Sequence, residues 1–255
     1  MIRELFDLSG RAAVVTGGSQ GIGFAIAEGL ASAGAEVVIV NRRAAQGRAA
    51  AERLAAKGLR VTALEADVGA RPAVERVVSA VLERHGRLDI LVNSAALIVR
   101  KPIEDVTDQD WDALMRVNLH GLFLCCQCAG RQMLRQGGGK IINIASNIVQ
   151  PLQPLRGLYA VTKAGVAQLT RVLALEWAPR GVTVNAIAPA PTITELNREF
   201  FAAHPQDLQD RIRSIPLGRM GAPQDYVGAA LLLASRASDF ITGQTLFVDG
   251  GTNLL

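Results

Sequence analysis

The sequence predicts a single-domain α/β protein in which a doubly wound parallel sheet of about seven strands carries helices on both faces. Apolar runs typical of strands alternate with helical patterns over almost the whole chain, and this alternation indicates parallel strands joined by right-handed crossovers. Hydrophobic residues make up 49% of the 255 residues but aromatic residues only 4%, which predicts the aliphatic core of strands that are buried on both faces. Neither a repeat nor a low-complexity linker divides the chain, so we expect one domain over residues 1–255.

Three strand–helix units account for the first third of the chain. Gly34, Gly58 and Gly86 directly follow the three helical patterns, and glycine is the residue that most often ends a helix. The expected strands are 12–16, 37–40 and 61–66, and the expected helices are about 21–33, 44–57 and 71–85.

Four more strands and three more helices complete the pattern. Thr107 and Asp110 resemble a capping box at the start of a long helix, and Pro223 suits the first turn of another. The expected strands are 88–92, 140–144, 182–187 and 244–248, and the expected helices are about 107–136, 158–177 and 223–235. Residues 188–216 break the regularity, with weak periodicity and three prolines before the last. Because inserted loops of this length often cover binding sites, we expect a substrate lid at about 190–216.

Composition argues against several classes of function. The net charge of +4 comes from scattered basic residues without a Lys/Arg run, so we expect no nucleic-acid partner. No stretch approaches 18 uninterrupted apolar residues and no signal-peptide pattern is visible, so we expect a cytoplasmic protein without a membrane partner. Cys125, Cys126 and Cys128 crowd into one helical stretch with no second Cys or His cluster, which predicts buried free thiols and no metal site.

A glycine-rich turn links the first strand to the first helix. Residues 16–23 read Thr-Gly-Gly-Ser-Gln-Gly-Ile-Gly, a spacing of Gly-x-x-x-Gly-x-Gly. Glycines there permit a tight turn and close approach of a phosphate, and the helix N-terminus offers free N–H groups and the positive end of its dipole. In this strand–turn–helix context the pattern predicts binding of a dinucleotide.

The end of the second strand indicates which dinucleotide binds. An acid at this point would bind the ribose 2′-hydroxyl of NAD, whereas arginine accommodates the 2′-phosphate of NADP. The chain has Asn41, Arg42 and Arg43 there and no acid. Paired guanidiniums suit a phosphate, so we favour NADP(H) over NAD(H).

Tyr159 and Lys163 stand four residues apart on an expected helix, so their side chains share one face. A free tyrosine titrates near pH 10, and a neighbouring ammonium favours the phenolate and lowers that pKa. The pair is therefore a candidate acid–base group, although the same spacing also occurs by chance in many helices.

The chain as a whole resembles the short-chain dehydrogenase/reductase family, in its compact Rossmann-type, single-domain form. The order and spacing of the matching elements carry the resemblance. These elements are residues 16–23, Asp67-Val68, the Asn93–Ala95 run, Asn118, Ser146, the Tyr159/Lys163 pair and the stretch from Asn185 to Pro189.

The resemblance implies four catalytic residues. Tyr159 would be the general acid in ketone reduction and the base in alcohol oxidation, and Lys163 would lower its pKa and hold the nicotinamide ribose. Ser146 would hydrogen-bond the substrate oxygen, and Asn118 would bind a water in a proton relay to Lys163.

The resemblance also implies a cofactor site. Asp67 would accept a hydrogen bond from the adenine amino group, Val68 would pack nearby, and Asn93 would steady the floor of the site. The full expected set is Gly17, Ser19, Gln20, Gly21, Ile22, Gly23, Asn41, Arg42, Arg43, Asp67, Val68, Asn93, Ala95, Tyr159, Lys163, Pro189, Thr192 and Thr194. The chain departs from the family at Ala96 and Ala190, where relatives carry glycine; each alanine adds a methyl group and restricts φ.

The function expected from these features is an NADP(H)-dependent oxidoreductase that interconverts a ketone and a secondary alcohol. Gln150, Gln153 and Arg156 make the expected substrate wall partly polar, which favours a sugar, a polyol or a keto acid. A 3-oxoacyl-(acyl-carrier-protein)-type reductase is the alternative, with Arg131, Arg135 and Arg180 as candidate contacts to an acidic carrier. A non-catalytic NADP-binding scaffold is a remote alternative. The resemblance further implies a homotetramer that pairs through helices around 112–136 and 158–178.

Overall fold

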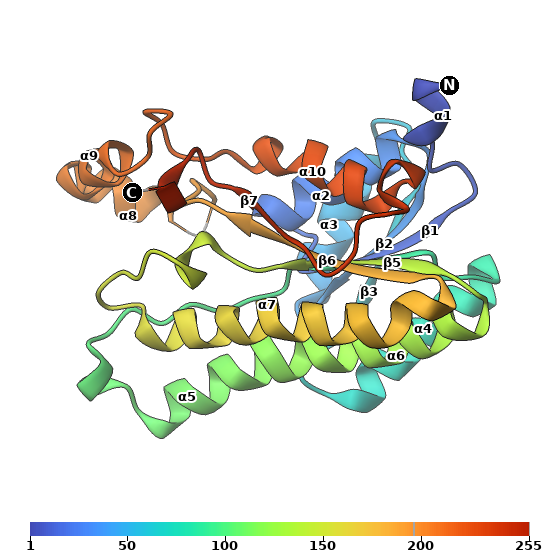
Figure 1. Ribbon diagram of the computed structural model, residues 1–255, viewed down its shortest axis with the longest axis horizontal. Helices are drawn as coiled ribbons and strands as arrows, with labels where there is room; N and C mark the ends of the chain where they lie inside the picture. Colours follow the sequence, from blue (N-terminus) through green and yellow to red (C-terminus); the bar gives the residue numbers. More distant parts are fainter. Residues whose placement is uncertain (196, 255) are drawn as a thin grey trace.

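A seven-stranded, all-parallel sheet forms the centre of the molecule, with the strand order β3-β2-β1-β4-β5-β6-β7. The computed structural model describes residues 1–195 and 197–254 (Figure 1). The strands are β1 (Ala12–Thr16), β2 (Glu36–Asn41), β3 (Val61–Glu65), β4 (Ile90–Asn93), β5 (Gly139–Ile144), β6 (Val182–Pro189) and β7 (Thr245–Val248). The predicted fold class is confirmed, and each strand lies within two residues of its predicted bounds.

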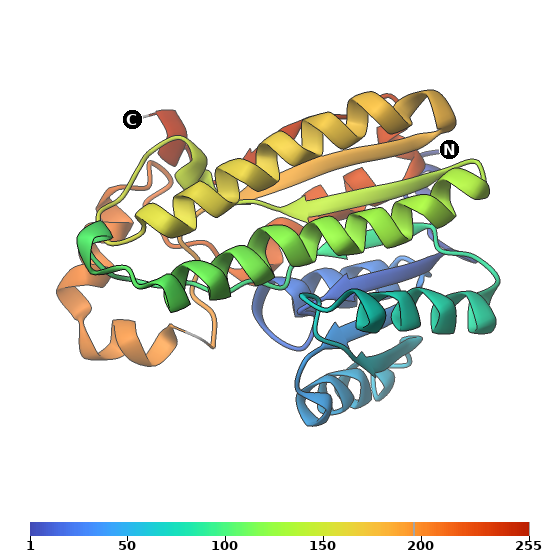
Figure 2. The same ribbon diagram turned by 90° about the horizontal axis from the view of Figure 1, so that it is seen from below.

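Helices cover both faces of the sheet. The α-helices are α1 (Ile2–Leu5), α2 (Gly21–Ser32), α3 (Ala44–Ala55), α4 (Arg71–His85), α5 (Asp108–Leu114), α6 (Leu122–Arg135), α7 (Gly157–Trp177), α8 (Arg198–Ala203), α9 (Pro205–Arg213) and α10 (Val227–Ala234). Short 3₁₀ turns are η1 (Ile103–Asp105), η3 (Asn147–Val149), η4 (Ala178–Arg180), η5 (Pro223–Tyr226), η6 (Arg236–Ser238) and η7 (Thr252–Leu254). One face carries α4, α6 and α7, and the other carries α2, α3 and α10 (Figures 1 and 2).

Two aliphatic cores follow from this layering, one on each face of the sheet. Val14, Val38 and Leu91 point into the core under α4 and α6, whereas their neighbours Val15 and Ile39 point into the core under α2 and α3. Each fully buried Val, Leu or Ile contributes roughly 1.5–3 kcal/mol relative to its exposed state. The near-continuous apolar strands seen in the sequence are therefore explained by burial on both sides.

The long helix predicted over 107–136 is divided in the structure. The capping box is confirmed, since the Asp110 N–H donates to Thr107 Oγ1 at 3.2 Å and the Thr107 N–H donates to Asp110 Oδ2 at 3.1 Å. Between α5 and α6 lies a π-helical stretch, η2 (Met115–Gly121), which contains Asn118. π-Helical turns are rare and frequently mark functional sites.

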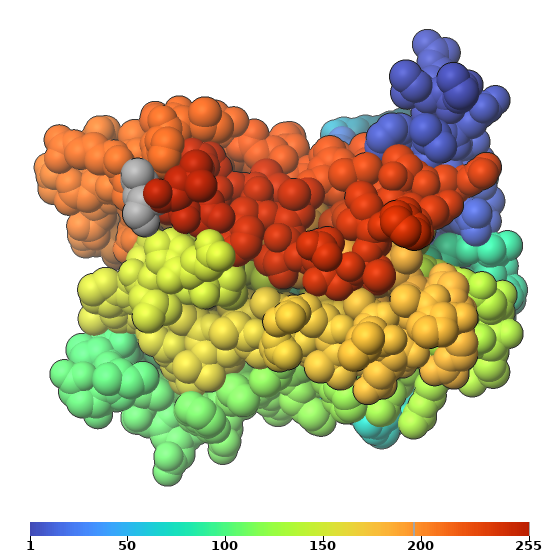
Figure 3. Space-filling view, viewed as in Figure 1, coloured from blue at the N-terminus to red at the C-terminus, as the bar shows by residue number. Residues whose placement is uncertain are grey.

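Residues 190–216 are more regular than the sequence predicts, because they contain α8 and α9. Phe201, Ile215 and Met220 form a small core of their own, against which Leu208 and Ile212 pack. Figure 3 shows α8 and α9, in orange, standing at one end of the molecule. Leu196, which the predicted lid includes, and Leu255 lie outside the described residues. None of the helices described is long and apolar enough to cross a membrane.

Candidate functional site

A cleft of about 310 Å³ lies at the carboxyl ends of the strands, beside the point where the strand order reverses between β1 and β4. Ligands bind at such switch points in open α/β sheets. The structure brings all predicted cofactor residues into its lining except Asn93, Pro189 and Thr192. The cleft is also lined by residues that the predicted cofactor set does not include: Val40, Gln46, Ala66, Ser94, Ala96, Leu97, Val117 and Ile144. Several of these follow strand ends directly, and this position is the signal that could have identified them.

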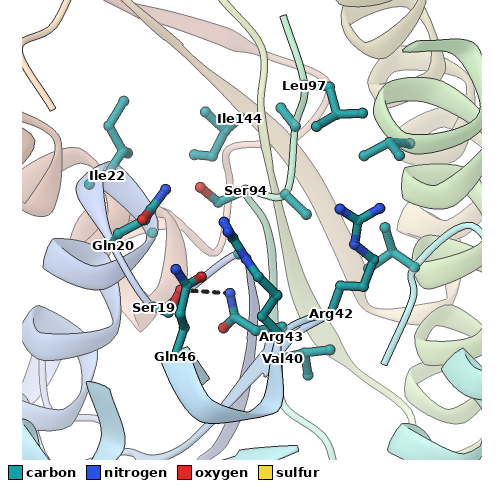
Figure 4. A pocket seen from close by; sticks show the side chains of 18 of the residues that line it. Ser19, Gln20, Ile22, Val40, Arg42, Arg43, Gln46, Ser94, Leu97 and Ile144 are labelled. Atoms are coloured by element: carbon teal, nitrogen blue, oxygen red, sulfur yellow. Dashed lines mark hydrogen bonds between the residues drawn. The ribbon is translucent and has the colours of Figure 1, made fainter. Parts of the chain in front are cut away.

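The glycine-rich turn is shaped so that a side chain would fill it. Gly17 has φ +67°, and a Cβ there would lie 2.8 Å from the Ala95 Cα. A Cβ on Gly23 would lie 2.5 Å from the carbonyl oxygen of Gly17. The Asn41 side-chain amide donates to Ser19 Oγ at 2.7 Å and so ties the turn to β2 (Figure 4). This cradle, together with the N-terminus of α2, fits a pyrophosphate.

Two arginines border the cleft at the end of β2. Arg42 and Arg43 extend from the end of β2 and are exposed (Figure 4). Asp67, predicted to bind adenine, accepts hydrogen bonds from Arg116 Nη1 at 2.7 Å and from the Gly69 N–H at 2.9 Å. Partial burial raises the pKa of Asp67, but these two hydrogen bonds outweigh it and the net pKa is lowered. Arg116 was not predicted, because nothing in its position along the chain pairs it with Asp67.

Tyr159 and Lys163 stand together at the other end of the cleft. The Lys163 Nζ lies 5.6 Å from the centroid of the Tyr159 ring and donates to the carbonyl oxygen of Ile144 at 2.6 Å. Burial raises the pKa of Tyr159 to about 12, against the opposing effects of a hydrogen bond with Ser146 and of the Arg156 charge. Burial likewise lowers the pKa of Lys163 to about 8. The predicted lowering of the Tyr159 pKa by Lys163 is therefore not seen, since desolvation is the largest effect on both groups.

Asn118 connects the π-helical stretch to the loop after β4. Its side-chain amide donates to the Leu97 carbonyl oxygen at 2.9 Å and to Thr162 Oγ1 at 3.2 Å, and its carbonyl oxygen accepts from the Leu97 N–H at 2.8 Å. Only 1% of Asn118 is exposed. These hydrogen bonds hold Leu97, which lines the cleft, in place.

Three predicted cofactor residues lie outside the cleft lining. Asn93 is buried and donates through Nδ2 to Asn143 Oδ1 at 2.9 Å and to Cys126 Sγ at 3.2 Å. Pro189 is the last residue of β6. Thr192 hydrogen-bonds through its hydroxyl to the Ala190 carbonyl oxygen at 2.8 Å and to the Tyr226 hydroxyl.

The two alanines that replace family glycines fit without backbone strain. Leu155, with φ 64°, is the one non-glycine residue with positive φ in the described part of the chain, so Ala96 and Ala190 both keep an ordinary φ. The three cysteines are free and buried, as predicted. Over residues 1–195 and 197–254, no cluster of three or more His, Cys, Asp and Glu is placed to hold a metal ion.

Comparison with known proteins gives matches over almost the full length. A family model described as enoyl-(acyl carrier protein) reductase matches residues 17–253. The chain is 39% identical to gluconate 5-dehydrogenase of Gluconobacter oxydans, covering 97% of this chain and 96% of that protein. It is 38% identical to an NAD-dependent glycerol dehydrogenase of Listeria innocua, covering 96% and 95%. A gluconate 5-dehydrogenase from Burkholderia cenocepacia, solved with NADP and tartrate, superposes with a TM-score of 0.93, at 40% identity and full coverage of both chains.

Proposed function

Because the chain belongs to the short-chain dehydrogenase/reductase family, we propose that this NAD(P)-dependent dehydrogenase uses NADP(H) to interconvert a ketone and a secondary alcohol on a sugar, a polyol or a keto acid. The observation that carries the proposal is the layout of one cleft. The glycine-rich turn, residues 17–23, lies at one end, and Tyr159 with Lys163 lies at the other.

Each end of the cleft has its own task. The turn and the N-terminus of α2 would hold the pyrophosphate, and Lys163 would hold the nicotinamide ribose. The nicotinamide supplies or accepts the hydride. Tyr159, whose raised pKa keeps the phenol protonated at neutral pH, would give its proton to the carbonyl oxygen during reduction. Ser146, which interacts with the phenol, would orient the substrate oxygen.

NADP(H) is favoured by charge at the adenosine end. Arg42 and Arg43 line the cleft, and no carboxylate within the described residues forms an ion pair with either. Two free guanidiniums suit a 2′-phosphate. A relative named as NAD-dependent and a solved relative containing NADP show that cofactor choice differs among similar proteins, so it has to be argued from these two residues.

The substrate class is supported by the polar wall and by the relatives. Gln153 and Arg156, both partly buried, precede Tyr159 in the chain. Similar proteins are named for gluconate and glycerol. The description of the matching family model keeps an acyl-carrier-protein substrate as the second candidate.

The deciding experiment is a substrate panel assayed with both cofactors. D-Gluconate, glycerol and a 3-oxoacyl thioester would each be tested with NADP(H) and NAD(H), for the wild type and for Tyr159→Phe. We expect turnover of a polyol or sugar acid with NADP⁺ and a loss of at least about 100-fold in Tyr159→Phe, in line with the contribution of a general acid–base group. Unchanged NADPH binding by the variant shows that the fold is intact. Equal turnover by Tyr159→Phe would exclude the acid–base role.

We also propose that the enzyme is a homotetramer. Leu175 and Val161, on α7, are 81% and 51% exposed, and Phe240 before β7 is fully exposed. Exposed apolar side chains on the predicted pairing helix support association. A sedimentation mass equal to one 27.0 kDa chain would contradict this proposal.

A further inference from the structure

Three arginines from distant parts of the chain gather beyond Tyr159. Arg100 lies in the loop after β4, Arg156 directly precedes α7, and Arg211 lies on α9. Figures 1 and 2 both show these three segments at the same end of the molecule. The guanidinium charges of Arg100 and Arg156 both act on the Tyr159 hydroxyl, so both lie near the proposed reacting group.

Specific contacts hold these segments together. Arg211 donates through Nη1 to Gln153 Oε1, and this hydrogen bond joins α9 to the segment 150–156 before α7. The Arg100 guanidinium lies over the Phe200 ring, 5.6 Å from its centroid. The Lys101 N–H donates to the Leu155 carbonyl oxygen at 3.0 Å.

The charges of this cluster are not balanced by carboxylates. Other arginines of the chain have close acidic partners, as in the pairs of Arg87 with Asp89 and Arg219 with Asp225. None of the three clustered arginines has a carboxylate within 4 Å in the described part of the chain. The Asp207 carboxylate acts on Arg211 from a greater distance.

Burial makes this imbalance costly. Arg156 and Arg211 are both partly buried. Burial, followed by the charges of Arg211 and Arg100, lowers the pKa of Arg156 to about 10. Burial and the Arg100 charge also lower the pKa of Arg211. Partly buried like charges without a counter-ion destabilise a fold, unless a ligand supplies the missing negative charge.

The backbone beside Arg156 is also unusual. Leu155, its neighbour, has φ 64°, a left-handed conformation that side chains with a Cβ rarely adopt. Such outliers cluster at sites that bind ligands. Leu155 accepts the hydrogen bond from the Lys101 N–H and directly precedes Arg156. Its backbone conformation therefore sets the direction of the Arg156 side chain.

We propose that Arg100, Arg156 and Arg211 form a subsite for a substrate group that carries two negative charges, either a phosphate monoester or a pair of carboxylates. The subsite rests on the proposed function, since it selects substrates for Tyr159. Three guanidiniums, one of them near Asp207, leave about two positive charges to neutralise. A single carboxylate would leave one of them unpaired. Because Arg211 belongs to α9, a bound dianion would also link residues 190–216 to the segment 150–156 before α7.

A matched series of six-carbon substrates tests the charge preference. D-Sorbitol, D-gluconate and D-glucarate carry no, one and two carboxylates, and D-sorbitol 6-phosphate carries the same double charge as a phosphate. We expect the lowest KM for one of the two dianions, and the better of the two identifies the anionic group. A wild-type enzyme with equal KM for sorbitol and both dianions would overturn the subsite.

Arg211→Gln is the decisive variant, because the Arg211 charge is not among those that act on Tyr159. We expect Arg211→Gln to lower kcat/KM for the preferred dianion at least tenfold relative to kcat/KM for sorbitol. Arg213→Gln is the matched control, since Arg213 lies on the same helix but is exposed and paired with Asp210. An equal effect of both substitutions, or none from Arg211→Gln, would refute the assignment.

A measurement of dianion binding tests the subsite separately from the proposed function. Calorimetric titration of D-glucarate and D-sorbitol 6-phosphate into the NADPH-loaded enzyme is expected to show binding to the wild type and at least tenfold weaker binding to Arg100→Gln, Arg156→Gln and Arg211→Gln. Dianion binding without turnover of any substrate would keep the subsite and reject the proposed function. Turnover with no dianion binding, or with binding that the variants do not weaken, would reject the subsite and keep the function.

Discussion

The carboxylate of Glu195 lies at the N-terminus of α2, where the Gly21 N–H donates to Glu195 Oε2 at 3.2 Å. Gly21 is the first residue of that helix and lines the cleft. The N–H groups and the positive dipole end at this point form the predicted pyrophosphate site. A side chain of the 190–216 segment therefore uses a donor that belongs to the predicted pyrophosphate site.

Glu195→Gln is expected to strengthen NADPH binding. The amide keeps the size and the acceptor of the carboxylate but removes a negative charge from beside the pyrophosphate. A charge at a helix terminus is worth about 0.3–1 kcal/mol, so we expect the Kd for NADPH to fall roughly two- to fivefold, measured by fluorescence titration. Glu199→Gln, which removes an exposed carboxylate from α8, is the control. Weaker binding by Glu195→Gln would show that the carboxylate supports the site instead of competing for it.

Cofactor preference is expected to change when the arginines after β2 are removed. Arg42→Ala and Arg43→Ala each delete a guanidinium that would contact the 2′-phosphate of NADP. Hydrogen bonds to charged groups are worth about 1.5–3 kcal/mol, and exposure puts these two at the lower end. We expect kcat/KM for NADP⁺ to fall about tenfold in each variant, while kcat/KM for NAD⁺ stays the same. Arg48→Ala, on the exposed face of α3, controls for the loss of one charge, and a parallel fall with both cofactors would contradict the assignment.

The regular elements of this fold could be predicted because buried apolar residues recur along the sequence with the period of a helix or a strand. β1 and α4 have the predicted bounds of 12–16 and 71–85. The cofactor cleft could be predicted for the same reason, since its residues follow strand ends and parallel strands end at one edge of the sheet. Gly17 and Asp67 were thereby placed in one cleft from positions 50 residues apart in the chain.

Contacts between a loop and a distant helix could not be predicted, because no periodicity links the two partners. Arg116 meets Asp67 across the cleft edge, and Arg211 reaches Gln153 from another helix. The raised pKa of Tyr159 has the same origin. The spacing of Tyr159 and Lys163 places them on one face, but burial and the direction of the Lys163 side chain toward Ile144 depend on the packed fold.

The two directions of the reaction are expected to respond differently to pH. With a pKa of about 12, raised chiefly by burial, Tyr159 stays protonated throughout the neutral range. Ketone reduction needs the phenol, so titration of Tyr159 leaves its rate flat between pH 6 and 9, and a bend near pH 8 would report Lys163, whose pKa burial lowers to about 8. Alcohol oxidation needs the phenolate, so kcat/KM is expected to rise about tenfold per pH unit over the same range. Steady-state rates in both directions check this, and an oxidation rate that levels off near pH 7 would show that the bound cofactor lowers the Tyr159 pKa.

The pH dependence of the free energy of unfolding is expected to show the burial of the Lys163 ammonium. Burial lowers its pKa from 10.5 to about 8 in the folded protein, so between these two values the unfolded chain binds more protons and the folded state gains stability as pH rises. The gain is lost again as pH falls through this window, and below pH 8 the full cost of the buried charge is present. At 1.36 kcal/mol per pKa unit, the free energy of unfolding should increase by about 3 kcal/mol between pH 8 and 10.5.

Lys163→Met lacks the buried ammonium and should lack this increase. Urea unfolding of both proteins between pH 7 and 10.5 is expected to show a difference, wild type minus variant, that is constant below pH 8 and then rises. Lys57→Met is the control for the loss of a lysine, because that side chain is 57% exposed and pairs with Glu28 on the surface. A wild-type minus Lys163→Met difference that does not change with pH would mean that Lys163 reaches solvent in the folded protein. In that case burial could not be the reason why the Lys163 ammonium donates to the carbonyl oxygen of Ile144. It could also not explain why Lys163 does not lower the pKa of Tyr159.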